Sequence, residues 1–405
     1  MNKAPSGKGK ENRPKFPGWP IWDDEDIESV SQVIRSGQWW AGAPAAQAGE
    51  NVWAFQKEFA AFQESRHCIA VANGSAAIEV ALTALGVGLG DEVIVPDYTF
   101  VASASAVITA NAVPILCDID PRTFVMDVSR LETLISERTR AIVAVHLGGN
   151  PVDMERLCGV AEKNGFAVVE DCSHAQGSRF KGRRVGNWGN AGTFSFQASK
   201  ILTAGEGGAI VCNDDELAAR VYSLSDCGRH VGEYFYEHYE YGGNYRMSEF
   251  NAAVLRAQLR RFPEQHRLRN ANARYLTGKL NAIGGIRVME PTPGTEELGY
   301  YVYPFLFDPA EFSGITREEF RRRLTAAGIP TVDCYPPLHR LICFRERNLR
   351  RGIDYSRANW GGPLSEDSLF PVVVDVYSRS IELPHEVLLA QTRQLDYIAS
   401  VIQDF

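Results

Sequence analysis

The sequence predicts an α/β protein with a mainly parallel central sheet that is covered by helices. Two observations predict this fold. From about residue 66 to residue 214, short apolar runs alternate with stretches whose apolar residues have helical spacing. The apolar runs are nearly uninterrupted, which is typical of strands that helices bury on both faces. The 405 residues are enough for two domains of ordinary size.

The predicted strands follow one another along this part of the chain, each bounded by a helical stretch or a turn. The first strand leads into the helical stretch NGSAAIEVALTALGV, and the second into a helical run towards Ala112. The last two strands form a predicted hairpin, because glycines that allow a tight turn lie between them. The seven runs are CIAVA (68–72), EVIVP (92–96), AVPILCDID (112–120), RAIVAVHLGG (140–149), FAVVEDCSHA (166–175), AGTFSF (191–196) and GGAIVCND (207–214).

The second half predicts a long helix and then a smaller α+β domain. The helix is expected from Ser248 to Leu280, with Ser248 as its N-cap and a kink or break near Pro263. After it, strands such as YYVYPFLF and SIELP alternate with helices. The expected organisation is a mobile leader over residues 1–17, a large domain over residues 18–265 and a small C-terminal domain over residues 266–405.

Composition and charge argue against several classes of protein. Lys and Arg number 42 against 50 Asp and Glu, and the net charge of −8 gives no electrostatic reason to bind nucleic acid. No apolar run is long enough to span a bilayer, so no membrane association is expected. The leader lacks the apolar core of a secretory signal, which predicts a cytoplasmic protein. The eight cysteines include no CxxC pair, so we expect reduced, mostly buried thiols and no metal site.

Three features lie where predicted strands end, which is the edge at which α/β sheets bind ligands. Asn73-Gly74-Ser75-Ala76 opens a helix, where small residues let backbone N–H groups approach a phosphate, although such a start is usually structural. Asp171 ends the fifth strand, where a buried carboxylate needs a cationic partner, unless it merely caps a helix. Lys200 follows the sixth strand, five residues after Ser195. An amine that burial deprotonates can form an imine, whereas a lone lysine is usually a surface charge.

In this order the motifs resemble those of the DegT/DnrJ/StrS aminotransferases, enzymes that use pyridoxal 5′-phosphate (PLP). The resemblance covers nearly the whole chain, from about Trp19 to the C-terminus. It implies PLP fold type I, which is aspartate-aminotransferase-like, with a smaller C-terminal α+β domain. The matching segments are NGSAAIEVAL, GDEVIVPDYTFVASASAV, VEDCSHAQGS, TFSFQASKILTAGEGGAIV and GGNYRMSEFNAAVLRAQL.

The resemblance also implies roles for the matching residues. Lys200 takes the position that holds the cofactor as a Schiff base, Asp171 the partner of the pyridine nitrogen, and His174 a place near the ring hydroxyl. These three are the expected catalytic residues. The other expected cofactor-binding residues are Gly74, Ser75 and Ala76 in the phosphate-binding turn, Ser195 at the phosphate, Phe100 stacked on the ring, and Asn244 at the phosphate of the neighbouring subunit. The role of Asn244 implies a homodimer with shared active sites.

The resemblance to subgroups of this family indicates the reaction. FPGWPIWDDED, SGQWW and the run from His385 to Leu389 are similar to enzymes that act on small cyclic ketones. We therefore expect transfer of an amino group from L-glutamine or L-glutamate to a keto-cyclitol of the scyllo-inosose type. Three alternatives stay open: a nucleotide-linked keto-sugar aminotransferase, an enzyme like 3-amino-5-hydroxybenzoate synthase, and a PLP-binding regulatory protein without turnover.

A few other residues have no settled role in the sequence. Trp39 and Trp40 either line a substrate pocket or pack, and His146 is either functional or structural. Cys172 is expected to pack, because no base is evident near it. Tyr98 is a poorer stacking candidate than Phe100, which holds the matching position in the family pattern.

Overall fold

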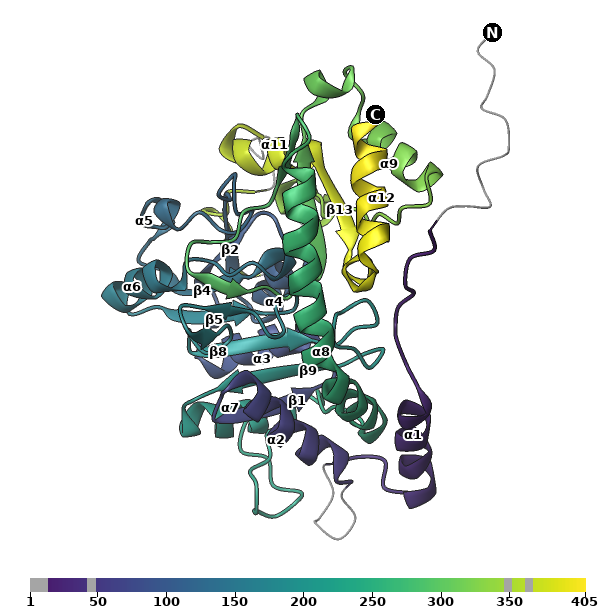
Figure 1. Cartoon of the computed structure of the whole chain (residues 1–405). Helices are drawn as coiled ribbons and strands as arrows, with labels where there is room; N and C mark the ends of the chain where they lie inside the picture. Colours follow the sequence, from purple (N-terminus) through teal and green to yellow (C-terminus); the bar gives the residue numbers. More distant parts are fainter. Residues whose placement is uncertain (1–13, 42–48, 346–351, 361–366) are drawn as a thin grey trace.

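The computed structural model describes residues 14–41, 49–345, 352–360 and 367–405 (Figure 1). Most of the expected leader, residues 1–17, lies outside the described residues. Within them, no helix combines the length and the apolar character that crossing a bilayer requires. All eight cysteines are free, and five of them are buried.

A seven-stranded sheet forms the centre of the molecule, in the order β1-β9-β8-β5-β4-β2-β3 (Figure 1). Neighbouring strands from β8 to β3 are parallel, whereas β9 is antiparallel to both of its neighbours. The predictions of a mainly parallel sheet and of the β8–β9 hairpin are confirmed. The strands are β1 (His67–Val71), β2 (Glu92–Pro96), β3 (Val113–Cys117), β4 (Thr139–Val145), β5 (Ala167–Asp171), β8 (Ala191–Ser195) and β9 (Gly208–Cys212).

Several predicted runs are longer than the strands they contain. β4 ends at Val145, and the chain then turns through Gly148 and Gly149, whose φ angles of 62° and 89° end the extended backbone. β5 ends at Asp171, although the apolar run continues to residue 175. The residues beyond the strand ends therefore lie on loops at the C-terminal edge of the sheet.

Helices cover the sheet. α3 packs on β5, β8 and β9, α6 packs on β5, and α2 packs on β1. The helices are α1 (Asp24–Ser36), α2 (Asn51–Gln63), α3 (Gly74–Ala84), α4 (Ala102–Thr109), α5 (Leu131–Leu134), α6 (Met154–Asn164), α7 (Asp215–Ser225), α8 (Glu249–Leu280), α9 (Arg317–Ala326), α10 (Ile342–Arg345), α11 (Pro371–Arg379) and α12 (Thr392–Gln403).

The long helix α8 starts where the sequence predicts. Ser248 is its N-cap, and the Ser248 side chain accepts a hydrogen bond from the backbone N–H of Asn251. The helix is continuous through Pro263, so a break there is ruled out, whereas a kink at this position stays a prediction. A proline removes one backbone hydrogen bond, and the buried side chains of Phe262 and His266 on either side hold the helix in place.

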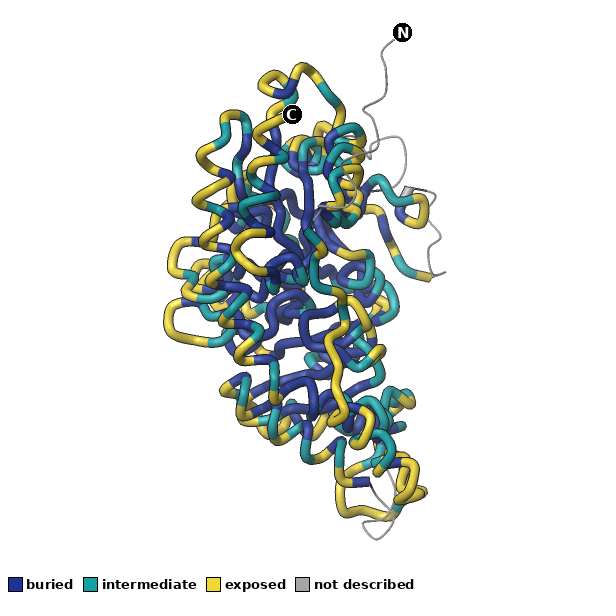
Figure 2. Tube along the Cα trace, turned by 45° about the vertical axis from the view of Figure 1, so that its right-hand side comes forward, coloured by how far each residue is buried: buried dark blue, intermediate teal, exposed yellow. Residues whose placement is uncertain are grey.

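α8 connects the large sheet to a second, antiparallel sheet (Figure 1). One continuous apolar core extends through both, from Val143 in β4 to Phe305 in β12, and Figure 2 shows the buried stretches running through the whole molecule. The boundary expected between residues 265 and 266 stays a prediction. The remaining strands are β10 (Ile286–Val288), β12 (Val302–Phe307) and β13 (Ser380–Pro384) in this sheet, and β6 (Arg179–Phe180), β7 (Arg183–Arg184) and β11 (Thr295–Glu297) in a third.

Candidate active site

A cavity of about 740 Å³ lies at the C-terminal edge of the large sheet. Its walls come from the ends of β5 and β8, the first turn of α3, the chain between β2 and α4, and two tyrosines of the C-terminal half. Seven of the nine residues expected from the sequence line it: Gly74, Ser75, Phe100, Asp171, His174, Ser195 and Lys200.

The first turn of α3 forms one end of the cavity. Asn73 caps the helix, and its Oδ1 accepts the N–H of Ala76 at 2.9 Å. The N–H groups of Gly74 and Ser75 therefore face the cavity end of the helix without an intrahelical partner, where the helix dipole is positive. A Cβ on Gly74 would lie 2.7 Å from the Cβ of Ser195, so only glycine lets the turn approach β8 this closely. Ala76 is buried and does not line the cavity.

Asp171 presents a buried carboxylate to the cavity. Its Oδ2 accepts a hydrogen bond from Ser103 Oγ at 2.7 Å, and its Oδ1 accepts the N–H of Ser173 at 3.1 Å. Among the described residues, no Lys, Arg or His lies within ion-pair distance of this carboxylate. A buried carboxylate that faces an open cavity without a bonded cation fits a ligand that brings a cationic N–H, as the pyridinium nitrogen of PLP would.

Lys200 is buried and lines the same cavity. Burial lowers the pKa of its amine to about 8, and the negative charge of Asp171 opposes this shift. The Nζ atom lies 4.0 Å from the centroid of the Tyr301 ring. The chain after Lys200 turns back into β9 through Gly205, whose φ of 80° suits glycine.

His174 packs between two tyrosines. Its ring stacks on Tyr301 with centroids 4.1 Å apart, and its Nε2 lies 3.3 Å from Tyr335 Oη. Its Nδ1 accepts the N–H of Gly148, so the proton of the neutral ring is on Nε2. Burial, aided by the charge of Lys200, lowers the His174 pKa well below its usual value, which keeps the ring uncharged.

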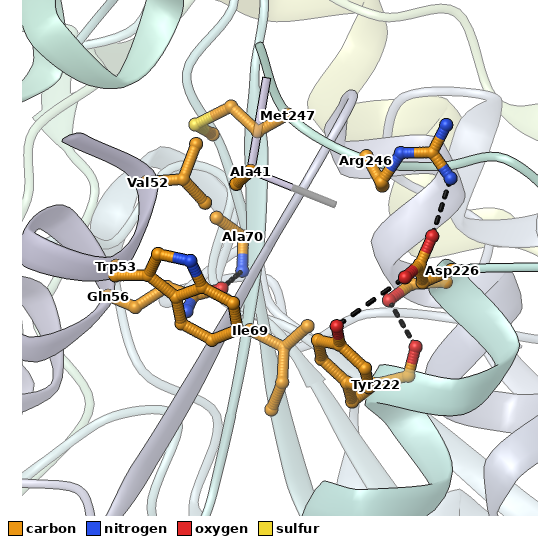
Figure 3. Close-up of a pocket in the computed structure, with 11 residues that line it drawn as sticks. Ala41, Val52, Trp53, Gln56, Ile69, Ala70, Tyr222, Asp226, Arg246 and Met247 are labelled. Carbon is orange, nitrogen blue, oxygen red and sulfur yellow. Dashed lines mark hydrogen bonds and ion pairs between the residues drawn. The ribbon is translucent and has the colours of Figure 1, made fainter. Parts of the chain in front are cut away.

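Asn244 does not line this cavity. It lies at the edge of the large sheet beyond β1, where its backbone pairs with Asp226. Asp226 is anchored there by Arg246 and Arg229, and Tyr222 donates to it beside a second cavity of about 30 Å³ (Figure 3). Asn244 therefore lies outside the active-site cavity of its own subunit.

The residues without a settled role lie outside the cavity as well. Trp39 and Trp40 are exposed, and Trp40 contacts Arg246 and Phe235. His146 is fully buried and hydrogen-bonded to Glu170, which indicates a structural role.

Two further buried side chains lie away from the cavity. Tyr98 is buried and donates to Glu382, so its ring is not available for stacking in the cavity. Cys172 is buried in an apolar cluster, and burial raises its thiol pKa well above the usual value, which fits packing.

Three residues of this site were not expected from the sequence. Ser103 donates a hydrogen bond to Asp171. Its place one turn after Thr99, in the matching segment that contains Phe100, was the feature of the sequence that could have identified it. Tyr301 and Tyr335 form a wall beside Lys200. No local pattern distinguishes these two tyrosines from core residues, because their approach to the cavity depends on how the C-terminal half packs.

The fold and the buried lysine–carboxylate cavity together define an enzyme of the aminotransferase class. The structure matches the crystal structure of 3-amino-5-hydroxybenzoic acid synthase with a TM-score of 0.86 over 97% of this chain and 98% of that one, at 33% identity. The sequence matches the DegT/DnrJ/EryC1/StrS aminotransferase family model over residues 20–402, and the chain belongs to this family. The resemblance drawn from the motifs, the type I fold and the assignment as an enzyme are thereby confirmed.

Two relatives of known name share most of the sequence. The L-glutamine:2-deoxy-scyllo-inosose aminotransferase of Streptoalloteichus tenebrarius is 39% identical over 82% of this chain and 81% of that protein. The L-glutamine:scyllo-inosose aminotransferase of Streptomyces griseus is 36% identical over 98% of this chain and 95% of that protein. Both fall in the cyclitol subgroup that the sequence motifs indicate.

Proposed function

We propose that the enzyme binds PLP in the 740 Å³ cavity and transfers an amino group from L-glutamine to a keto-cyclitol. The observation that carries the proposal is that this cavity is shared by a buried amine of lowered pKa and a buried carboxylate to which no cation is bonded within the described parts of the chain. The residues that would hold the cofactor are Gly74, Ser75 and Ser195 at the phosphate, Asp171 at the ring nitrogen, His174 near the ring hydroxyl, Phe100 at the ring face and Lys200 as the Schiff base. Bound PLP supplies an electron sink and carries the amino group between the two substrates.

Lys200 is the residue that moves protons. Because burial lowers its pKa to about 8, about a tenth of the Nζ amines are neutral at pH 7, far more than for an ordinary lysine. A neutral amine can take a proton from a substrate carbon and return it to another position. Asp171, held in place by Ser103 and Ser173, is the carboxylate that would pair with a cationic ring nitrogen.

The charges around the site favour an uncharged, hydroxyl-rich acceptor. A third cavity, of about 420 Å³, adjoins the 740 Å³ active-site cavity and shares Ser199, Tyr301 and Tyr335 with it. Asp333, Glu382 and Glu386 line this cavity, and no Lys or Arg is among its lining residues in the described chain. Asp333 is ion-paired with Arg321, and burial raises the Glu382 pKa to about 7. Cyclitol hydroxyls can donate to the carboxyl oxygens of this cavity, whereas a nucleotide diphosphate would find no Lys or Arg among its described lining residues.

The names of the two relatives support L-glutamine as donor and a keto-cyclitol as acceptor. A second candidate function is amination of the ketone used by 3-amino-5-hydroxybenzoic acid synthase. The structural match to that enzyme, with a TM-score of 0.86, favours it.

We also propose that the enzyme is a homodimer in which Asn244 contributes to the partner's site. The segment from residue 231 to residue 241 carries strongly exposed apolar and aromatic side chains, among them Val231, Tyr234 and Tyr236. Clusters of this kind on a protein surface mark interaction sites. The segment leads directly to Asn244, so a partner that covers it would bring Asn244 near a second active site.

The test is a donor and acceptor screen with the PLP-loaded enzyme, followed by mass spectrometry of the aminated product. We expect product from L-glutamine with scyllo-inosose or 2-deoxy-scyllo-inosose, and none from the Lys200→Ala variant. Product from a nucleotide keto-sugar alone would contradict the proposed substrate. Product from a dehydroshikimate-type ketone alone would select the second candidate.

A further inference from the structure

Two consecutive backbone carbonyls just before Lys200 are held by side chains from opposite ends of the chain. Trp19 Nε1–H donates to the carbonyl of Ala198 at 3.1 Å, and His385 Nε2 lies 3.0 Å from the carbonyl oxygen of Ser199. The Trp19 and His385 rings meet edge to face, with centroids 4.5 Å apart. The segment that carries the lysine is therefore fixed by contacts that the β8–β9 hairpin does not itself supply.

Arg269, in α8, and the Ser199 carbonyl together fix which nitrogen of His385 carries the proton. Its Nη2 lies 3.3 Å from His385 Nδ1, and arginine has donors but no acceptor. Nδ1 must therefore accept, which leaves the hydrogen on Nε2, where it is donated to the Ser199 carbonyl. Burial first, and then the charges of Arg269 and Lys200, lower the His385 pKa well below its usual value. Glu386, whose Oε2 lies 3.9 Å from Nε2, is too distant for a hydrogen bond.

Arg269 has no evident structural reason to be an arginine. It is fully buried, and its Nε and Nη1 have no hydrogen-bond partner among the described residues. Burial lowers its pKa to about 9, with Glu386 opposing the shift. A buried cation without a bonded carboxylate is costly, and an apolar side chain would be the more stable choice for packing alone. Its guanidinium lies 5.3 Å from the Trp19 ring and next to His385, the two side chains that hold the segment before Lys200.

We propose that Trp19, His385 and Arg269 are positioning residues for the catalytic Lys200. Trp19 and His385 hold the two carbonyls before the lysine, and Arg269 locks His385 in the tautomer that can do so. The result is a Lys200 amine that stays buried over the Tyr301 ring. The proposal rests on the role of Lys200 in the proposed function, but its first test does not require the cofactor.

The first test measures the Lys200 pKa in cofactor-free protein, from the pH dependence of its modification by an amine-reactive reagent, read by peptide mass spectrometry. In the wild type we expect a midpoint near the value of about 8 that burial produces. His385→Phe keeps the ring but loses the hydrogen bond, so Lys200 regains water and its midpoint rises by about one pH unit or more. His385→Gln, whose amide can still donate to the carbonyl, is expected to restore the wild-type midpoint.

An unchanged midpoint in a folded His385→Phe variant would overturn the proposal. His67→Phe, at a partly exposed site paired with Asp215, is the matched control and should not move the midpoint. If His385→Phe does not fold, Trp19→Phe serves instead. That variant removes one hydrogen bond at a partly exposed position and should raise the midpoint by a smaller amount.

The second test uses the PLP-loaded enzyme and separates kcat from KM. A displaced reacting group costs on the order of 10²-fold in rate, so we expect His385→Phe to lower kcat by about that factor and to leave the KM for the ketone within about twofold. A rise of about 10²-fold in the KM for the ketone, with an unchanged kcat, would contradict a positioning role. Absence of any PLP binding in the wild type would instead reject the proposed function and leave the first test intact.

A third test addresses Arg269 by measuring the ¹⁵N chemical shifts of the His385 ring, which report which nitrogen carries the proton. The resonances are assigned by their loss in the His385→Gln variant. We expect the Nε2–H tautomer in the wild type from about pH 6 to about pH 8. Arg269→Met leaves the Ser199 carbonyl as the remaining partner that favours the Nε2–H form, so a minor Nδ1–H population is expected to appear. A wild-type ring that is charged, or protonated on Nδ1, would refute the lock.

Discussion

Burial, more than any neighbouring charge, determines the chemistry of Lys200. The lysine is nearly inaccessible to solvent, and burial lowers its pKa from 10.5 to about 8 even though Asp171 favours the charged form. A buried ammonium group without an ion-pair partner is unstable relative to the neutral amine. The same burial that lowers the pKa of the amine therefore costs stability in the cofactor-free protein.

This cost predicts that Lys200→Met stabilises the cofactor-free protein at pH 7, by up to about 3 kcal/mol for a shift from 10.5 to about 8. Between about pH 8 and pH 10.5, the unfolded wild type binds more protons than the folded one, so wild-type stability rises with pH. The advantage of the variant should be full below about pH 8 and vanish near pH 10.5. Urea unfolding at pH 7 and pH 10 measures it. The exposed Lys163→Met is the control, and an advantage that is equal at both pH values would contradict the argument.

Ser103 is a second residue whose contribution can be isolated. Ser103→Ala removes the 2.7 Å hydrogen bond to Asp171 and leaves a buried carboxylate with one donor fewer. Hydrogen bonds to charged groups contribute about 1.5–3 kcal/mol, so the free energy of unfolding should fall by about that amount. Ser105→Ala, on the same helix and partly exposed, should change it by less than about 0.5 kcal/mol. Equal losses in thermal or urea unfolding would show that Ser103 does not support Asp171.

Strands end and a helix begins at the same edge of the large sheet. The carboxyl ends of β5 and β8 and the N-terminus of α3 meet at one edge of the sheet, because parallel strands point the same way and the helix follows β1 in the connection. Strand ends supply side chains such as Asp171, and the helix start supplies free N–H groups. The site depends on the cap of α3 as much as on its side chains.

The N-cap of α3 gives a test at this scale. Asn73→Ala removes the hydrogen bond from Asn73 Oδ1 to the Ala76 N–H and should cost about 1 kcal/mol of stability. It should also weaken PLP binding, because the amides of Gly74 and Ser75 are no longer fixed. Asp214→Ala removes the equivalent cap of α7, away from the cavity, and should cost similar stability with no change in PLP affinity. Fluorescence titration measures the affinity, and equal affinities in both variants would contradict the role of this helix start.

At the scale of the whole molecule, the site is assembled from parts that are remote in sequence. The segment before Lys200 is held by Trp19 near the N-terminus and His385 near the C-terminus. Asn244, expected at the phosphate of the neighbouring subunit, is not among the residues that line the cavity of its own subunit. A complete site therefore requires the C-terminal half to pack on the large sheet and, as we propose, a second subunit.

Mixing two inactive variants tests the shared site. In a heterodimer of Lys200→Ala and Asn244→Ala subunits, one site combines the intact Lys200 of one subunit with the intact Asn244 of the other. An equal mixture that is unfolded and refolded together should recover about a quarter of wild-type activity, while each variant alone stays inactive. Light scattering should give a dimer of the 44.8 kDa chain. A monomer, or a mixture without recovered activity, would exclude the shared site.

The sequence by itself determined the α/β class and the positions of Asp171, Ser195 and Lys200 at strand ends. This was possible because burial on both faces leaves an unbroken apolar run, and because parallel strands place their ends together. It did not determine the continuity of α8 through Pro263, which neighbouring buried side chains decide.

Only the tertiary structure brought Tyr301, Tyr335, Trp19 and His385 to Lys200, and only it left Ala76 outside the cavity. Contacts between residues more than a hundred positions apart depend on how two sheets pack against a common helix. The spacing of apolar residues along the chain does not indicate that packing. The position of the lysine at the end of a strand was therefore predictable from its neighbours in the chain, whereas the contacts that hold it in place were not.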